Sequence, residues 1–159
     1  MFVLIRALIY SALFLWLWAM LVPQWLGLVA PTPAAMGPAQ YTGLVVGAAG
    51  LGLALWCVWN FARTGRGTPL PADAPRELVA TGPYRYSRNP MYVGGTALIA
   101  GSAIYLRSWP FVLYAAGFFT LTFIIVVMYE EPHLRNVFGE SYRAYKTATP
   151  RWIPRLGSR

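Results

Sequence analysis

The sequence contains few of the residues on which many soluble folds and catalytic sites depend. Its one cysteine, Cys57, cannot form a disulfide within the chain, which excludes a disulfide framework and a cysteine-rich metal centre. His133 is the only histidine, and we expect no metal site. Charged residues make up 11% of the chain, against about 25% in soluble domains. An ordinary soluble domain is therefore excluded.

Apolar residues are abundant instead, at 57% of the 159 residues. A membrane span needs about 20 mostly apolar residues, and four segments approach that length: Phe2–Val22, Tyr41–Ala62, Met91–Leu106 and Trp109–Tyr129. We expect the first to be a retained helix. The prolines between Pro23 and Gln40 predict a non-helical connection. The sequence predicts an all-α integral membrane bundle of about four transmembrane helices with a C-terminal helical hairpin. It forms one domain, 1–159, with an N-terminal two-helix part, 1–62, and a second part, 76–154.

Positive charges are distributed unevenly about these segments. Twelve of the 13 lysines and arginines lie at the N-terminus, between the second and third segments, or after the fourth, and so on one side of the membrane. Only Arg107, between the third and fourth segments, falls on the other side. The positive-inside rule then places both termini, residues 63–90 and a cytoplasmic C-terminal segment on the cytoplasmic side. Because the cations flank spans, the net charge of +8 predicts contact with membrane lipids and no nucleic acid partner.

The third and fourth spans are predicted to form a hairpin that brings two polar stretches together. Only Arg107 and Ser108 separate the spans, which favours antiparallel helices. Asn89 followed by Pro90 is typical of a helix start, with Asn89 as the N-cap. The fourth span is expected to end at Tyr129-Glu130-Glu131-Pro132, at the same membrane face.

The Glu130–Glu131 pair at a helix end requires a cation nearby, because the helix dipole and the mutual repulsion both disfavour it. The candidates are Arg85, Arg88, Arg135, water in the headgroup zone, or a ligand with an ammonium or sulfonium group. After Pro132, Gly139 is a predicted helix stop, and Tyr142 and Tyr145 share a face of the following turn. By itself, this pattern fits a segment that lies on the bilayer, with its aromatic side down and its basic side up.

Glycines at the spacing of Gly43 and Gly47 let two membrane helices approach closely. The sequence leaves open whether these helices belong to one chain or to two, and the oligomeric state is unknown.

Two patches together resemble a known family. "GPYRYSRNPMYVG" and, one hairpin later, "EEPHLRNVFGESYRAYKTATPRWIP" are similar to the isoprenylcysteine carboxyl methyltransferases and to the wider membrane methyltransferase group that includes phospholipid N-methyltransferases. The matching residues are Arg88, Asn89, Pro90, Tyr92, Gly94, Glu130, Glu131, Leu134, Phe138, Gly139, Tyr142 and Tyr145.

The resemblance implies S-adenosylmethionine as methyl donor, S-adenosylhomocysteine as product, and a lipophilic or prenylated acceptor at a cytoplasmic site. Glu130 and Glu131 would bind cationic or hydroxyl groups of the donor, and Arg88 would bind a carboxylate of donor or acceptor. Arg88 and Glu131 are thus the catalytic candidates. The expected cofactor-binding residues are Asn89, Pro90, Tyr92, Gly94, Glu130, Glu131, His133, Tyr142 and Tyr145.

One departure separates the chain from this pattern. Asn89 stands where the family usually has histidine, and an asparagine does not carry a proton. An acid-base role would then be absent, or would have moved to His133. Carboxyl O-methylation is the leading expectation, with methylation of a phospholipid amine or a small thiol as alternatives. An NADPH-dependent sterol-type reductase and a non-catalytic membrane protein are alternatives of other classes.

Overall fold

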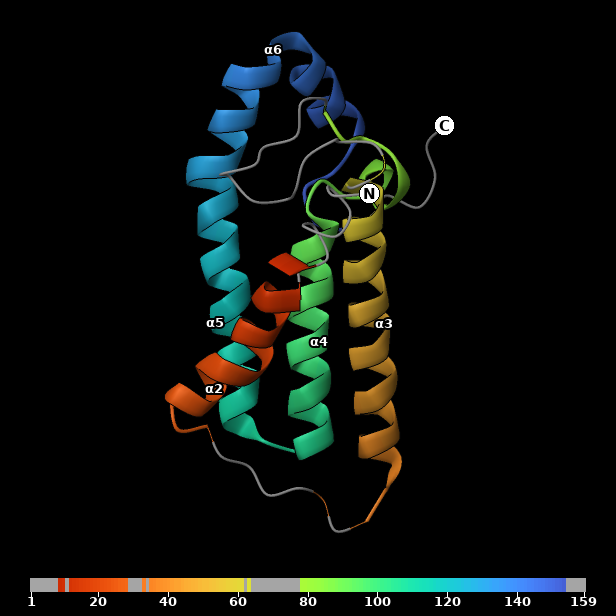
Figure 1. Cartoon of the computed structure of the whole chain (residues 1–159), viewed down its shortest axis with the longest axis vertical. Coiled ribbons are helices and arrows are strands. Elements are labelled where there is room, and N and C mark those ends of the chain that lie inside the picture. The colour runs from red at the N-terminus through yellow and green to blue at the C-terminus, as the bar shows by residue number, and fades with distance from the viewer. Residues whose placement is uncertain are drawn as a thin grey trace.

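The computed structural model describes residues 9, 10, 12–28, 33, 35–61, 63 and 78–153. Every regular element in this part of the chain is a helix (Figure 1), as the sequence predicts. The start of the first predicted span, most of the loop before residue 78 and the last six residues lie outside the described residues.

Four long helices form the fold in the described part of the chain. The first, Ala12–Trp25, contains a π-helical turn, η1 (Leu17–Leu21), and ends as α2 (Val22–Trp25). The others are α3 (Pro38–Asn60), α4 (Pro90–Leu106) and α5 (Trp109–Ile125), which continues through η5 (Val126–Glu130) into α6 (Glu131–Ala148). A short 3-10 helix, η4 (Gly82–Arg85), precedes α4.

The predicted non-helical connection from Pro23 to Gln40 is wrong at both of its ends. Pro23 lies in the first turn of α2, and Pro38 begins α3. Pro38 stands at the start of its helix, where a proline has no intrahelical hydrogen bond to lose. Pro23 instead lies inside the helix Ala12–Trp25, in the turn that follows the π-helical η1.

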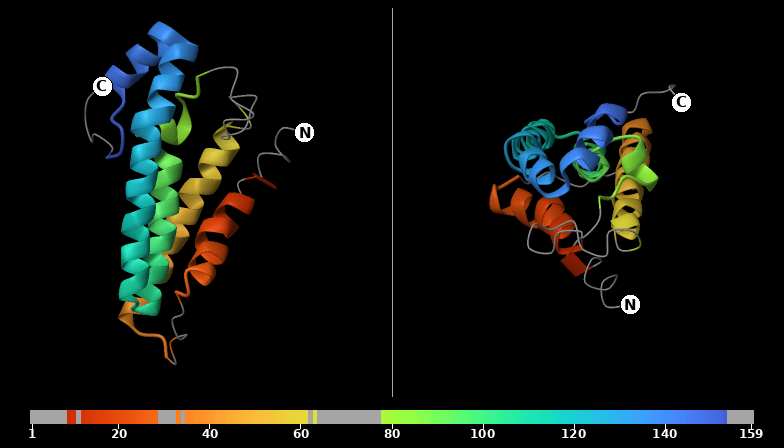
Figure 2. Two further views of the ribbon diagram at one scale, coloured as in Figure 1. Left: turned by 90° about the vertical axis from the view of Figure 1, so that its left-hand side faces the viewer. Right: turned by 90° about the horizontal axis from the view of Figure 1, so that it is seen from above.

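Helices α3 and α4 pack most extensively, through glycines (Figure 2). A Cβ on Gly101 would lie 2.7 Å from the oxygen of Gly43 and 2.6 Å from the Cα of Gly47. One on Gly94 would lie 2.7 Å from the oxygen of Gly50. The close approach predicted from Gly43 and Gly47 therefore occurs within one chain.

The α4–α5 hairpin is confirmed, and the N-terminal helix crosses in front of it in Figure 1. Arg107 ends α4 in the left-handed conformation, at φ 49°. The Trp18 ring contacts Phe118 of α5 edge-on, with 5.2 Å between centroids. The Tyr114 hydroxyl donates to the backbone oxygen of Trp18 at 2.6 Å. These contacts hold the N-terminal helix against α5.

The helix itself does not end at Tyr129–Pro132, the end predicted for the fourth span, because it continues from Trp109 through Pro132 to the break at Gly139. Pro132 has no N–H to donate to the preceding turn, and the wider π-helical turn η5 lies directly before it. The chain reverses at Gly139 instead, where φ is 53°. The second half of α6 then descends beside the start of α4 (Figure 1).

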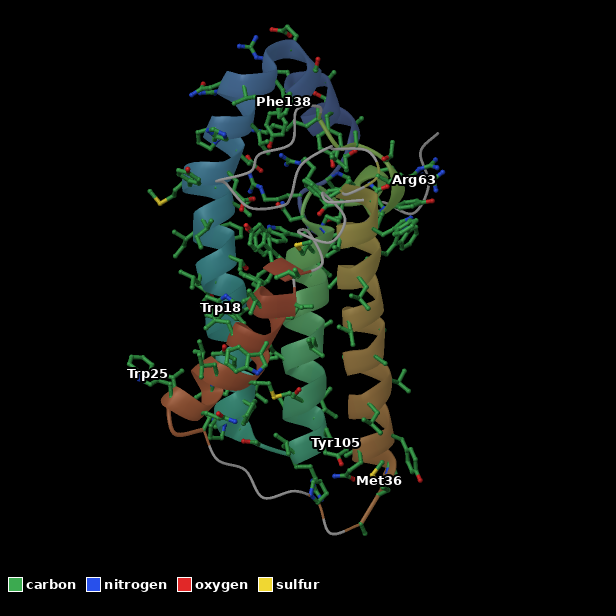
Figure 3. The ribbon with its side chains drawn as sticks, viewed as in Figure 1. Trp18, Trp25, Met36, Arg63, Tyr105 and Phe138 are labelled. Carbon is green, nitrogen blue, oxygen red and sulfur yellow. The ribbon has the colours of Figure 1, made fainter. Side chains whose placement is uncertain are left out.

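Among the residues that the structure describes, two helices are long and apolar enough to cross a membrane, Pro38–Asn60 and Trp109–Ala148. Ala12–Trp25 and Pro90–Leu106 are apolar but shorter. Apolar side chains such as Val45, Leu113 and Met128 are exposed, which suits a surface covered by lipid. In Figure 3, Met36 and Tyr105 lie at one end of the bundle and Arg63 and Phe138 toward the other. We call the end of the bundle toward Arg63 and Phe138, where α3 ends and α4 begins, the polar end.

Candidate functional site

The segment that enters α4 is held against the end of α3. The Asn60 amide donates to the backbone oxygen of Thr81 at 2.8 Å. Gly82 follows with φ 57°, a conformation that favours glycine, and η4 then buries Tyr84. These contacts fix the path of residues 81–89 across the polar end.

Glu131 forms ion pairs with three cations from three parts of the chain. Its carboxylate lies 2.8 Å from Arg88 Nη1 and 3.6 Å from Lys146 Nζ. Arg151 binds it with two nitrogens, Nε at 2.7 Å and Nη2 at 3.0 Å. We call these four residues the Glu131 cluster. Of the predicted protein cations, Arg88 is the one that the structure pairs with Glu131.

The neighbouring charges of the cluster determine whether the carboxyl group of Glu131 is protonated. Burial alone would raise the pKa of Glu131, but the hydrogen bond from Arg151 and the charges of Arg88, Arg151 and Lys146 outweigh it. The net result is a pKa below the ordinary value for glutamate. Glu131 is therefore an anion at neutral pH.

Glu130, the neighbouring residue, has different surroundings. Its carboxylate accepts a hydrogen bond from the hydroxyl of Tyr92, and no cation in the described chain lies within ion-pair distance. Burial raises the pKa of Glu130, and the hydrogen bond from Tyr92 offsets only part of this rise. Two consecutive carboxylates thus have pKa values shifted in opposite directions.

Residues 149–152, which we call the C-terminal strap, lie against the start of α4. The backbone N–H of Arg88 donates to the oxygen of Pro150 at 2.9 Å. The backbone oxygen of Arg151 accepts from Ser87 Oγ and from Asn89 Nδ2, each at 3.1 Å. Three hydrogen bonds therefore attach the strap beside the Glu131 cluster.

Asn89 occupies the predicted N-cap position, but its side chain makes no capping hydrogen bond. A cap requires an oxygen that accepts from the first helical turn. Here the side-chain amide donates to Arg151 in the strap. Asn89 thus joins two distant segments, a role that the sequence analysis missed.

The two predicted tyrosines of α6 reach the same region. Arg88 Nη1 lies 3.4 Å from the Tyr142 hydroxyl, and Tyr142 is buried. The Tyr145 hydroxyl donates to the backbone oxygen of Tyr84 at 2.6 Å. After its reversal at Gly139, α6 therefore covers the residues that precede α4.

Other predicted site residues have structural contacts. Gly94 faces α3, where its missing side chain makes room for Gly50. Pro90 is buried at the first position of α4. His133 is exposed, and its ring stacks on Tyr129 with 6.0 Å between centroids. No hydrogen bond in the described chain joins His133 to the Glu131 cluster.

The sequence analysis missed Arg151 and Lys146 as partners of Glu131. It also missed the packing of Trp152 against α5. The Trp152 ring lies 5.1 Å from Phe119 and 6.0 Å from Phe123, between ring centroids. The available signal was the run of cations after Gly139, since a chain that turns back there returns them to the start of α4.

Comparisons with known proteins point to one group. The sequence model of the family described as "Phospholipid methyltransferase" matches residues 39–141, which include all of α3 except its first residue, α4, α5 and the two glutamates. Two curated proteins named phosphatidylethanolamine N-methyltransferase, from Sordaria macrospora and Neurospora crassa, are each 40% identical over 75 residues. That match covers 45% of this chain and 7% of each relative. The chain therefore covers less than a tenth of the length of these relatives.

Proposed function

Since the chain belongs to the phospholipid methyltransferase family, we propose that it is an integral membrane methyltransferase acting on a phospholipid amine. S-adenosylmethionine would be the donor, supplying a methyl group already activated by a positive sulfur. The observation that carries the proposal is the convergence of Arg88, Tyr92, Glu130 and Glu131 at one end of the bundle. All four residues stand at positions that match the family pattern described above.

The residues at the polar end suit a donor with one anionic and several cationic or hydroxyl groups. Arg88 has a buried Nε with no hydrogen-bond partner among the described residues. Glu130 has no cation beside it in the same part of the chain. Since unpaired buried polar groups are costly, both are available to a ligand. We propose that Arg88, Tyr92, Glu130 and Tyr142 hold the donor, and that Asn89, Pro90, Gly94 and Tyr145 position them.

The family favours the phospholipid alternative over carboxyl O-methylation. A phospholipid amine reacts as its neutral form, so its ammonium must first lose a proton. Glu130 is a candidate to accept that proton, because burial brings its pKa toward neutrality. A carboxylate acceptor needs no such base, and neither does a thiolate.

The orientation remains part of the proposal. We place the polar end, both termini and the donor site in the cytoplasm, with four membrane-crossing helices in a single domain, 1–159. The concentration of twelve of the 13 cations on one side of the predicted spans supports this orientation. The donor would then reach the site from water, and the acceptor would reach it from the lipid phase.

The test is methyl transfer by the purified protein in detergent or liposomes. Donor labelled in its methyl group is incubated with phosphatidylethanolamine and, separately, with a prenylated cysteine, and the products are separated by chromatography. We expect label in the phospholipid. Label found only in the prenylated cysteine would mean that the acceptor is a prenylated carboxylate and not a phospholipid. A protein that binds NADPH but not S-adenosylhomocysteine would instead be a candidate reductase.

A further inference from the structure

The C-terminal strap lies against an exposed, apolar side of α5. The Trp152 ring lies 5.1 Å from the ring of Phe119 and 6.0 Å from that of Phe123, between centroids. These phenylalanines are 36% and 40% exposed, on a helix apolar enough to cross a membrane. Figure 2 shows the strap descending from α6 alongside α5. The strap therefore continues the surface that α5 presents to lipid.

Trp152 lies well below the two glutamates along the axis of this helix. Phe123 precedes Glu130 by seven residues, and Phe119 precedes it by eleven. A helix rises about 1.5 Å per residue, so the two phenylalanines lie roughly 10 and 16 Å from Glu130 along the axis. The polar headgroup layer on each side of a bilayer is only about 5 to 8 Å thick. Trp152 is therefore level with the lipid ester groups or the upper acyl chains, even with Glu130 at the outer edge of the headgroups.

The backbone of the strap is compatible with this depth, because its polar groups have partners within the protein. The N–H of Thr149 donates to the oxygen of Tyr145 at 2.9 Å, and the oxygen of Pro150 accepts from the N–H of Arg88 at 2.9 Å. Pro150 has no N–H of its own. The oxygen of Arg151 accepts two side-chain hydrogen bonds from the start of α4. Non-helical backbone is tolerated at membrane depth when protein satisfies it in this way.

The side chains beside Trp152 suit the same position. The guanidinium carbon of Arg151 lies 5.9 Å from the centroid of the Phe123 ring, and its Nε binds Glu131 at 2.7 Å. A long basic side chain at the edge of the hydrocarbon commonly reaches toward the polar level in this manner. Ile153, the next residue after the strap, is 80% exposed. Lipid would remove this apolar surface from water.

We propose that Trp152 and Ile153 anchor the strap in the bilayer, at the level of the lipid ester groups and upper acyl chains. Membrane lipid covers this surface, which is continuous with the lipid-facing side of α5, and tryptophan is a residue typical of that level. The bilayer thereby helps to hold Arg151 beside Glu131. The inference rests on the membrane arrangement of the proposed function and not on its reaction.

The inference changes which part of the C-terminal segment meets lipid. The sequence pattern fits α6 on the bilayer with its tyrosines down, but Tyr142 is buried within the protein. The Tyr145 hydroxyl donates to the backbone of Tyr84. The strap, which follows these tyrosines, takes that place instead.

The test attaches a thiol-reactive fluorophore to Ile153→Cys and measures which quenchers reach it in liposomes, without donor. Cys57 is fully buried, so wild type gives the background labelling. Leu121→Cys is the lipid control, because Leu121 is 40% exposed in the middle of α5. Ser141→Cys is the aqueous control, since Ser141 is exposed just after the reversal of α6, at the top of Figure 1. It also controls for the affinity of the fluorophore itself for lipid.

The quenchers are iodide in the water and nitroxides on the lipid headgroup, near the ester groups, or at the end of the acyl chain. We expect the probe at Ile153→Cys to lose most fluorescence with the nitroxide near the ester groups. It should emit at a shorter wavelength than the probe at Ser141→Cys. Iodide should quench the Ser141→Cys probe and leave the Ile153→Cys probe almost unchanged.

Substitutions of Trp152 in the Ile153→Cys protein test the anchor itself. Trp152→Ala removes the ring that packs on α5, and we expect the probe to become accessible to iodide and to lose its quenching by lipid nitroxides. Trp152→Phe keeps an aromatic ring and should retain the original pattern. Thermal unfolding verifies the fold of each protein. An unchanged pattern in Trp152→Ala would overturn the role of Trp152.

Two further results would overturn the inference. Iodide quenching at Ile153→Cys as strong as at Ser141→Cys would place the strap in water. Protection from iodide without quenching by any lipid nitroxide would mean that protein, such as a second copy of the chain, covers this surface. Neither result bears on methyl transfer, so the proposed reaction would stand. A protein without methyl transfer could equally show the lipid contact, so the two failures are distinguishable.

Discussion

The body and the start of one helix, α4, are held in place by different kinds of contact. Along its length, glycines let it lie directly on α3, and no charged side chain takes part in that contact. At its start, Arg88 and Asn89 join it to α6 and to the C-terminal strap through charges and hydrogen bonds. The first contact depends on shape and the second on charge, so substitutions, pH and ligands should affect them separately.

The largest expected effect is on the glycine contact. Gly101→Ala would place a methyl group against the backbone of α3, which has no flexible atoms to move aside. We expect a loss of about 3 kcal/mol in the free energy of unfolding, measured by denaturation of the detergent-solubilised protein. Gly52→Ala is the control, because nothing lies within 4 Å of its Cβ position. Alanine there should stabilise α3 by up to about 1 kcal/mol, and equal losses in both variants would contradict the account.

The next effect concerns the polar end. Glu131→Gln leaves Arg88 without its carboxylate in a place with little solvent. We expect a loss of about 2 kcal/mol, less than the 3 to 5 kcal/mol of a fully buried pair, because Arg151 and Lys146 reach water. Glu140→Gln in the exposed pair should change stability by less than about 1 kcal/mol. Similar losses in Glu131→Gln and Glu140→Gln would show that the cluster contributes nothing special.

Acid should remove the difference between these variants. The pKa of Glu131 is lower in the folded protein than in the unfolded chain, so its stabilisation is present at neutral pH. That stabilisation is lost as the pH falls through the folded pKa. We expect the melting temperatures of wild type and Glu131→Gln to converge below about pH 4, measured by thermal scans across pH. A gap that stays constant would contradict this assignment of charge.

Glu130 should respond in the opposite direction. Its pKa is raised in the folded protein, so its ionised form destabilises the fold as the pH rises through the folded pKa. Glu130→Gln is therefore expected to unfold no more easily than wild type at neutral pH in the same thermal scans. A loss of stability as large as that of Glu131→Gln would mean that the two carboxylates are equivalent.

The smallest effect concerns the strap. Asn89→Ala removes one hydrogen bond to the backbone of Arg151, which is worth about 1 kcal/mol. The remaining contacts from Ser87 and Arg88 should keep residues 149–152 in place but exchanging faster. Hydrogen exchange of the strap amides measures this. Asn89→His, which restores the residue usual in related families, should exchange as Asn89→Ala does unless an imidazole N–H reaches the same oxygen.

The sequence predicted those parts of the fold that depend on local signals. Hydropathy located α3, α4 and α5 to within a few residues, because a helix in lipid must be apolar along its length. The short Arg107–Ser108 link predicted the hairpin, and the spacing of Gly43 and Gly47 predicted close packing. The partner of these glycines was not predictable, since the same spacing serves contacts within one chain and between two.

The site was predicted only in part, because its contacts join residues far apart in the chain. The expectation of a cation beside Glu131 followed from electrostatics, and Arg88 was one of the candidates. The role of Arg151 depends on the reversal at Gly139, which the sequence predicts as a helix stop, and on the hydrogen bonds of the strap, which no local pattern encodes. The continuation of α5 through Pro132 was missed because a proline usually ends a helix, and the π-helical turn that accommodates it has no clear sequence signal.

The most direct test of the account is photo-crosslinking with an S-adenosylhomocysteine analogue, followed by mapping of the labelled peptides. The account predicts saturable labelling of peptides that contain Arg88 and Tyr92, Glu130 and Glu131, or Tyr142, with competition by unmodified S-adenosylhomocysteine. Labelling confined to the opposite end of the bundle, near Gln40 and Tyr105, or labelling that S-adenosylhomocysteine does not compete away, would contradict it.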